Sequence, residues 1–463
     1  MDMNTTDQSD MSFPSQGGLR EMLALSLPMV VSHASETVLV FTDRLFLSRL
    51  GPVQMSAAMG GGLTAFMMTT FFLGLIGYTT ALAAQYLGAG QKNRCSTVLS
   101  QAVIIALLAY PLILAARPLA HGLFALTDVP AEQLEAQKLY FDILLGGTIL
   151  ALLRSCFASF FSGVGRTRVV MLSALTTMLV NVGANYVLIF GRLGLPALGI
   201  RGAAYGTILA SLCGLSVLLA AYLTESNRRE FGVVFPRLDG KVMRKLLRFG
   251  YPAGVELFLN LLAFTAMILI FHSHGLATAT AVTIVFNWDM VSFVPLLGIQ
   301  IGVVSLVGRY MGAGRPEIAE RVTLSGLKMG WAYSLVILVL FVGFPEQLVA
   351  VFQPEGADPI FAEAAPLATG MLRLAGLYVL ADAVMVVFSG ALRGAGDTFW
   401  TMCISVGLHW LLLPVLFVSL NILHLPPQTA WLVLVILFLS FSGAFYLRYR
   451  TGKWKSLAVV REG

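Results

Sequence analysis

Residues 398–447 read TFWTMCISVGLHWLLLPVLFVSLNILHLPPQTAWLVLVILFLSFSGAFYL and contain no Asp, Glu, Lys or Arg. The sequence HLPPQ at 424–428 divides this stretch into two apolar runs. Each run has about the 20 residues that a helix needs to cross a bilayer. Because lipid offers no hydrogen-bond partner to an unpaired backbone, we expect two membrane-spanning helices here, near 398–421 and 427–447.

The rest of the chain is also rich in apolar residues and poor in charged ones. It has 463 residues, of which 57% are hydrophobic and 12% are charged, against about 25% charged residues in ordinary soluble domains. A soluble fold cannot bury so much apolar sequence, so we predict an all-α integral membrane protein. Further apolar runs predict helices near 20–48, 55–87, 97–125, 136–161, 169–190, 199–223, 246–271, 279–311, 320–345 and 364–390, which makes twelve in all.

Basic residues predict the orientation in the membrane. Lys and Arg are concentrated in every second connection, in the tail 451–463 and in the linker 224–245. The positive-inside rule places such segments in the cytoplasm, so we expect both termini there, with 1–19 as a disordered tail. The net charge of +6 does not indicate a nucleic-acid partner, because the basic residues form no face interleaved with aromatic residues.

The chain repeats itself. LGAGQ at 87–91 and MGAGR at 311–315 lie 224 residues apart, and FSGVGRT at 161–167 corresponds to FSGALRGAGDT at 388–398. Each half contains six predicted helices, so the two halves share one orientation and are related by an axis along the membrane normal. The predicted units are an N-lobe at 20–223 and a C-lobe at 246–450.

Five carboxylates within the predicted helices are candidates for a functional role. A charged side chain there costs about 2.5–3.5 kcal/mol on insertion scales, so its default interpretation is functional. Glu36 and Asp43 are about two helical turns apart and point to one side of the first helix. For these two, a salt bridge near the surface is the alternative. The candidate cation-coupling and substrate-binding residues are Asp43, Glu36, Glu256, Asn260, Asp289 and Asp382.

Asn260 lies one turn after Glu256 and corresponds to Glu36 in the repeat. A position that is polar in both lobes indicates a cavity lining, with a helix-to-helix hydrogen bond as the alternative. Trp288, next to Asp289, is a candidate for stacking on an aromatic cation, with ordinary packing as the alternative. Three basic residues inside apolar runs are expected to snorkel to an interface or to pair with a buried carboxylate. They are Arg154, Lys328 and Arg373.

The sequence contains no visible catalytic or metal-binding pattern. The four cysteines, Cys95, Cys156, Cys213 and Cys403, lack metal-ligand and redox spacing. We therefore expect neither an enzyme nor a bound cofactor or metal, and the expected partners are small organic substrates and the lipid bilayer. We expect a monomer in the plasma membrane, the inner membrane of a bacterium.

Several segments together resemble the multidrug and toxic compound extrusion (MATE) transporters. They are LPMVVSHASETVLVFTDRLFLSRLG at 27–51, LGAGQ at 87–91, FSGVGRTRVVMLSALTTMLVNVGANYVLIFG at 161–191 and FSGALRGAGDT at 388–398. The resemblance spans most of the chain, from about Leu19 to Arg450. It implies a V-shaped, twelve-helix antiporter that exports organic, often cationic, compounds in exchange for H⁺ or Na⁺ by alternating access.

The resemblance also implies roles for single residues. Asp43 lies where the family has its helix 1 carboxylate, and Asp382 matches the helix 10 carboxylate of some members. Where those members have a helix 7 glutamate, this chain has Asn260, and Glu256, one turn earlier, is the candidate replacement. This departure leaves open the coupling ion and the lobe that binds it.

A lipid-linked saccharide flippase of the same superfamily is the alternative function. A flippase would favour a cationic cavity for pyrophosphate, whereas the deeply placed charges of this chain are mostly acidic.

Overall fold

The computed structural model describes residues 16–126, 129–232, 237–354, 358–457 and 459–460. The regular structure of these residues is entirely helical. Of the predicted tail 1–19, residues 1–15 lie outside the described residues, and the first helix begins at Leu19.

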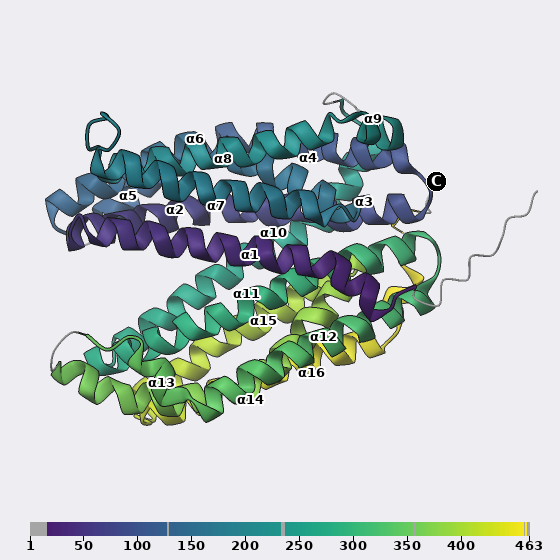
Figure 1. Ribbon diagram of the computed structural model, residues 1–463. Helices are drawn as coiled ribbons and strands as arrows, with labels where there is room; N and C mark the ends of the chain where they lie inside the picture. The colour runs from purple at the N-terminus through teal and green to yellow at the C-terminus, as the bar shows by residue number, and fades with distance from the viewer. Residues whose placement is uncertain (1–15, 127–128, 233–236, 355–357, 458, 461–463) are drawn as a thin grey trace, which may run out of the picture.

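The chain forms two helical bundles, one from each half of the sequence (Figure 1). The N-lobe and the linker contain α1 (Leu19–Ser48), α2 (Pro52–Gly77), α3 (Thr79–Gly88), α4 (Lys92–Ala115), α5 (Arg117–Ala125), α6 (Ala131–Gly163), α7 (Thr167–Phe190), α8 (Ile200–Tyr222) and α9 (Glu225–Phe231). The C-lobe contains α10 (Gly240–His272), α11 (Leu276–Gly312), α12 (Pro316–Gly343), α13 (Pro345–Ala350), α14 (Pro359–Ala395), α15 (Thr398–Phe417), η1 (Val418–Ile422), α16 (Pro427–Arg450) and η2 (Lys453–Ser456).

The described residues contain 12 helices that are long and apolar enough to cross a membrane. Three of these spans combine consecutive helices, α2 with α3, α4 with α5 and α15 with η1. The predicted all-α membrane fold with twelve spanning helices is therefore confirmed.

The linker between the lobes is shorter than the prediction of 224–245. It contains the short helix α9, and α10 begins at Gly240 instead of near residue 246. Asp239 caps α10, because its Oδ1 accepts hydrogen bonds from the backbone nitrogens of Lys241 and Val242 at 3.0 and 3.1 Å. The first turns of α10 are rich in Lys and Arg, so a reading based on apolar runs excludes them although they are helical.

The lobes contact each other through two equivalent helix crossings. α1 packs on α11, and α2 packs on α10. Glycines permit both crossings: a Cβ atom on Gly298 would lie 2.5 Å from the backbone nitrogen of Val30, and one on Gly74 would lie 2.5 Å from the carbonyl oxygen of Ala253. Gly74 and Gly298 are related by the 224-residue offset, so the repeat in the sequence is also a repeat of this contact.

The lobes come very close together where α3 meets the end of α11, which we call the closed end. A side chain on Gly88 would collide with the backbone of Arg309, and one on Gly312 would collide with that of Gln85. Gln85 Nε2 also donates to the carbonyl oxygen of Gly394 at 2.8 Å. At the opposite end, the open end, α5 and α13 lie on diverging bundles (Figure 1).

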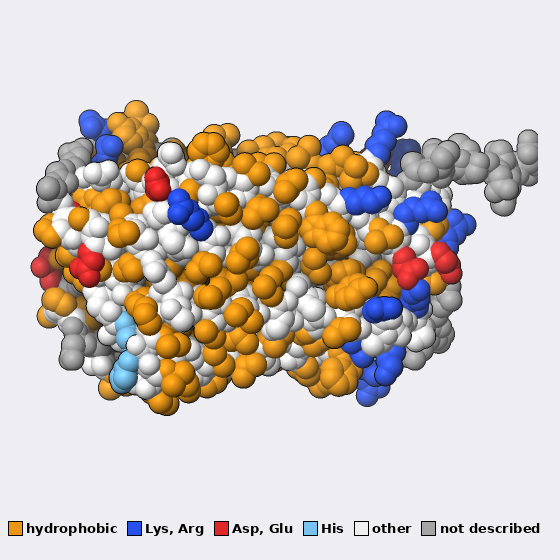
Figure 2. Space-filling view, turned by 90° about the horizontal axis from the view of Figure 1, so that it is seen from below, with side chains coloured by type: hydrophobic (Ala, Val, Ile, Leu, Met, Phe, Trp, Pro, Cys, Tyr) orange, Lys and Arg blue, Asp and Glu red, His pale blue; other side chains and the backbone are white. Residues whose placement is uncertain are grey.

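Charged side chains are distributed unequally between the two ends. Figure 2 shows Lys and Arg gathered at the closed end of the visible face, with an apolar band between the two ends. An apolar band of this kind suits a lipid environment, and a basic end suits the cytoplasmic side of a membrane.

Candidate functional site

The N-lobe holds one carboxylate within a group of amides and hydroxyls. Asp43 lies on α1, and its Oδ1 accepts a hydrogen bond from Asn185 Nδ2 of α7 at 2.5 Å. Asn185 Nδ2 also lies 3.2 Å from Asn181 Oδ1. Asn181 Nδ2 in turn donates to Thr207 Oγ1 of α8 at 3.3 Å. This group of four residues, the Asp43 site, thus joins α1, α7 and α8.

Asn185 presents an unused acceptor in this site. The residue is fully buried, and its Oδ1 has no hydrogen-bond partner among the described residues. A buried acceptor without a partner calls for an explanation, which an ion bound in the site can supply. Carboxylate and carbonyl oxygens are the ligands that hard cations prefer. The Asp43 site can therefore accept a proton or a small cation.

Glu36 lies on α1 closer to the closed end than Asp43, and it has charged partners. Arg154 of α6 donates to Glu36 Oε1 from Nη1 at 3.3 Å and from Nη2 at 3.2 Å. His33 Nδ1 lies 3.4 Å from Glu36 Oε2. The side chain of Glu36 is 45% exposed and that of Arg154 26%. Two outcomes were predicted for Arg154, and in the structure it pairs with a carboxylate.

The C-lobe brings two carboxylates together on α11 and α14. Tyr378 of α14 donates its hydroxyl to Asp289 Oδ1 of α11 at 2.8 Å. Asp382 lies one turn after Tyr378 on the same face of α14 and is buried. We call Asp289 and Asp382 the acidic pair. Two carboxylates in one buried region repel each other unless one is protonated or a cation lies between them, so the acidic pair can also hold a cation.

Glu256 and Asn260 connect α10 to other helices of the C-lobe. Glu256 Oε1 accepts from Arg393 Nη2 of α14 at 2.7 Å, and these side chains are 4% and 30% exposed. Asn260 Nδ2 donates to Ser405 Oγ of α15 at 2.8 Å. The structure therefore gives Glu256 an arginine partner, and no contact within the described residues joins it to the acidic pair.

Trp288 lies against α13 at the open end of the C-lobe. Its Nε1 donates to the carbonyl oxygen of Leu348 at 2.9 Å, and its ring meets Phe352 edge-on with the ring centroids 6.2 Å apart. The indole N–H is thus occupied, and a stacking role for the ring of Trp288 stays a prediction.

Among the residues of these sites that were not identified from the sequence are Asn181, Asn185 and Tyr378. Asn181 and Asn185 are four residues apart in the otherwise apolar run TMLVNVGANYVLIF at 177–190, and the same spacing separates Tyr378 from Asp382. Residues at this spacing share one helix face. A pair of polar residues four apart within an apolar helix is thus the signal that identifies them.

Comparison with known proteins identifies the family. The family model described as MatE matches residues 28–187 and 252–418, which is more than half of the chain and includes both lobes. A relative from Thermotoga maritima, named "Probable multidrug resistance protein NorM", is 28% identical over 455 residues, 95% of this chain and 94% of the relative. A relative of the same name from Bradyrhizobium diazoefficiens is 29% identical and covers 93% of this chain and 92% of its own.

Solved structures share the fold. One is described as "Outward-facing conformation of a multidrug resistance MATE family transporter of the MOP superfamily"; its TM-score is 0.86 at 20% identity, with 95% of this chain and 97% of that chain covered. A MOP superfamily transporter from Pyrococcus furiosus, described as having a binding pocket of reverse polarity, has the same TM-score, identity and coverage. At this identity the likeness shows the V-shaped fold alone. Since the family model matches both lobes, this chain belongs to the MatE family of multidrug and toxic compound extrusion transporters.

Proposed function

We propose that this transporter is a secondary-active exporter that exchanges an organic cation for H⁺ or Na⁺. In this proposal Asp43 binds the coupling ion, and the acidic pair of the C-lobe contacts the cationic substrate. The names of the relatives, which call them multidrug resistance proteins, support the export of organic compounds.

The unused Oδ1 of Asn185 beside Asp43 is the observation that carries the proposal. A protonated Asp43 would donate to this oxygen, and a bound Na⁺ would take it as a ligand. Either ion would satisfy the buried acceptor and neutralise the carboxylate at the same time. An Asn–Asp contact with a structural role alone would leave the acceptor unsatisfied, at a cost of about 1–3 kcal/mol.

Helix packing offers a route from the coupling ion to the substrate. α1, which carries Asp43, packs on α11, which carries Asp289. A shift of α1 when Asp43 binds its ion therefore reaches the acidic pair. Exchange requires that the two cations favour different states of the protein, and this shared crossing couples the two sites.

The closed end is the proposed cytoplasmic side. The Lys and Arg side chains gathered there (Figure 2) support this orientation through the positive-inside rule. The coupling ion then reaches Asp43 from outside the cell through the open end, and the substrate leaves by the same route.

The flippase alternative has less support. Arg154 is a basic residue deep in the N-lobe, but Glu36 is its partner. The acidic pair would repel a pyrophosphate group, whereas it attracts an organic cation.

The test is a substrate-triggered collapse of a pH gradient in inverted vesicles, with and without Na⁺. Asp43→Asn should abolish the substrate-triggered collapse of the pH gradient, because the asparagine side chain cannot bind and release the coupling ion as the carboxylate does. Asp142→Asn is the matched control: Asp142 lies in the open-end half of α6, where it pairs with Arg117 at 2.5 Å and His121 at 2.8 Å, and this variant should respond like the wild type. A full response from Asp43→Asn, with normal protein levels, would remove Asp43 from the coupling mechanism.

A further inference from the structure

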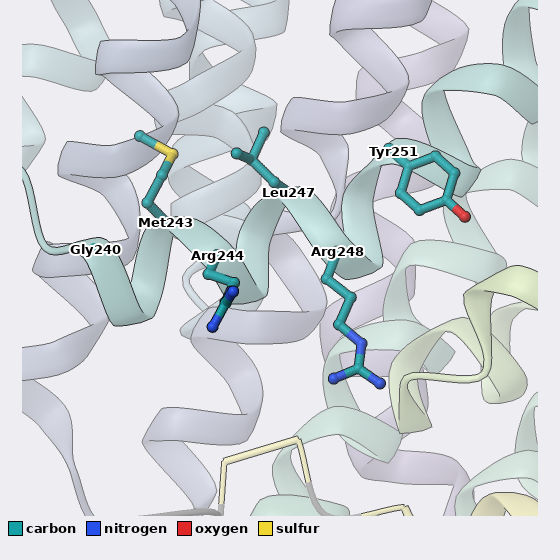
Figure 3. A pocket seen from close by; sticks show the side chains of 6 residues that line it. All are labelled: Gly240, Met243, Arg244, Leu247, Arg248 and Tyr251. Atoms are coloured by element: carbon teal, nitrogen blue, oxygen red, sulfur yellow. The ribbon is translucent and has the colours of Figure 1, made fainter.

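The first turns of α10 form a basic and partly apolar hollow at the protein surface. We propose that this hollow binds the headgroup of an anionic phospholipid in the leaflet at the closed end, with Arg244 and Arg248 holding the phosphate. Figure 3 shows the residues that line it: Gly240, Met243, Arg244, Leu247, Arg248 and Tyr251. The proposal is independent of the coupling mechanism.

The two arginines are arranged to share one phosphate group. Arg244 and Arg248 are four residues apart, one helical turn or about 6 Å along the axis, and their side chains project to the same side of α10 (Figure 3). Both are exposed, and neither has a carboxylate partner among the described residues. Guanidinium groups bind phosphate oxygens through paired, charge-assisted hydrogen bonds. The charge of the hollow is thus complementary to an anionic headgroup.

The depth of the hollow matches the headgroup region. α10 has 33 residues, whereas about 20 residues span the hydrocarbon core. Counting roughly 20 residues back from the open-end terminus at His272 reaches Pro252, so Tyr251 lies at the boundary and the arginines lie among headgroups. On α15, which packs against α10, Phe399 and Trp400 are 50% and 51% exposed at the closed end. Aromatic side chains are enriched at this level of a membrane.

The opposite face of the same helical turns is buried in the protein. Val242 and Leu246 are buried in the core of the N-lobe, and Phe249 packs against that core. The basic face therefore cannot turn inward. Leu247, 42% exposed between the two arginines along the chain, offers an apolar contact for the first part of an acyl chain. A free anion in solution has no acyl chain and would not need this apolar contact.

The repeat provides an internal comparison. By the 224-residue offset, Arg244 corresponds to Arg20, but Arg248 corresponds to Ala24 and Tyr251 to Leu27. The start of α1 thus lacks the second cation and the interfacial aromatic. We expect the lipid site on the C-lobe and not on its N-lobe counterpart.

The test uses the full-length protein, purified in detergent and titrated with phosphatidylglycerol or with phosphatidylcholine of the same acyl chains. Binding is followed by native mass spectrometry and by the melting temperature. The wild type should bind phosphatidylglycerol more tightly than phosphatidylcholine. In R244Q/R248Q the affinity for phosphatidylglycerol should fall roughly 30-fold, since two arginines near an anionic headgroup are removed.

The matched control is R450Q/K453Q, which removes two exposed basic residues from the closed end without touching the hollow. It should retain the wild-type affinity for phosphatidylglycerol. Arg248→Ala copies the α1 counterpart and should give an intermediate loss, and it serves as the test variant if the double variant folds poorly. The proposal is overturned if both arginine variants bind phosphatidylglycerol like the wild type, if the control loses as much affinity as R244Q/R248Q, or if inorganic phosphate stabilises the protein as well as the lipid does.

Discussion

The two lobes share a fold but surround their carboxylates differently. In the N-lobe, Asp43 lies among amide and hydroxyl groups, with an unused oxygen on Asn185. In the C-lobe, Asp289 accepts a hydrogen bond from Tyr378, and Asp382 lies one turn after Tyr378 on the same face of α14. One site suits a single small cation, and the other suits a cation that neutralises two carboxylates. The 224-residue repeat therefore preserves helix packing while the two halves differ in their chemistry.

Removing a carboxylate of the acidic pair should have the largest effect on transport. In Asp382→Asn, one of the two charges that attract the cationic substrate is lost, and the buried amide preserves the shape of the side chain. We expect drug efflux from cells to fall to the level of cells without the transporter. Membrane levels and folding should remain near those of the wild type. Unchanged efflux would restrict Asp382 to a structural role.

The ion pairs of the two lobes should differ in their contribution to stability. Arg393→Gln leaves Glu256, whose side chain is 4% exposed, charged and unpaired, and breaking a buried pair in this way costs about 3–5 kcal/mol. Arg154→Gln should cost no more than about 1 kcal/mol, because its partner Glu36 is 45% exposed. Thermal unfolding of the purified variants measures both.

The double variant Glu256→Gln/Arg393→Gln is the control for the buried pair. It removes both charges and should recover most of the stability that Arg393→Gln loses. Its transport also tests the predicted coupling role of Glu256: if stability returns and transport does not, Glu256 contributes to transport directly. Equal stability losses in the Arg393 and Arg154 single variants would contradict the difference between the lobes.

A side chain added at the closed end should lower the melting temperature by a similar amount in either lobe. Gly88→Ala and Gly312→Ala each place a Cβ atom against a backbone of the other lobe, and overpacking of this kind costs about 1–3 kcal/mol. Gly407→Ala is the control, because a Cβ atom there would have no neighbour within 4 Å. A lowered melting temperature in only one of the two test variants would show that the crossing is not symmetric.

The smallest effect is expected at the closed-end turns that follow α6 and α14. Arg166 and Asp397 occupy equivalent positions of GVGRT and GAGDT but have opposite charges. Asp397 is 6% exposed and bound by Arg448 at 2.7 Å, whereas Arg166 binds Glu230, 33% exposed, at 2.6 Å. The N-lobe pair of Arg166 and Glu230 is the more exposed one, so we expect it to contribute less to the stability of the fold.

Its contribution should depend on pH. Partial burial raises the pKa of Glu230, but the hydrogen bonds and charges of Lys92 and Arg166 outweigh burial and lower the pKa below its ordinary value. Ionised Glu230 therefore stabilises the fold above the ordinary pKa, and this contribution is lost as the pH falls through the lower folded pKa. Glu230→Gln should melt below the wild type at pH 7, and the difference should shrink as the pH falls below about 4.3, the ordinary pKa of Glu, and disappear below the lower folded pKa.

Glu225→Gln is the control for this pH dependence. Glu225 pairs with Arg229 of the same short helix, and both side chains are more than three-quarters exposed. This variant should melt like the wild type at both pH values. A difference between Glu230→Gln and the wild type that grows as the pH falls would contradict the assignment.

The sequence predicts the helices well because their signal is local. The uncharged stretch 398–447, for example, becomes α15 with η1 and then α16, with the break at the predicted residues. Errors occur where a helix continues beyond the apolar run. α10 begins at Gly240, and its first turns are basic. Hydropathy does not detect these residues as helical, because they lie among headgroups and not in the hydrocarbon core.

The sites are less predictable because they depend on the rotation of each helix about its axis. A helix that is apolar on all sides gives no indication of which neighbour a polar residue meets. The depth of Glu256 within its run suggested a cavity role, whereas its contact with Arg393 depends on how α10 faces α14. Asn181 and Asn185 become informative only when their spacing is considered together with Asp43 on another helix.

The most direct test of the Asp43 site is the release of its ion when substrate binds. Purified protein in weakly buffered solution is mixed with a fluorescent organic cation, and the released H⁺ or Na⁺ is measured together with the bound substrate. The account predicts that the wild type releases one of these ions in proportion to the substrate bound. Asp43→Asn should release less of these ions per bound substrate than the wild type, because only the ion displaced from the acidic pair remains, and its substrate affinity should depend less on pH or Na⁺. Release from Asp43→Asn equal to that of the wild type would contradict the account.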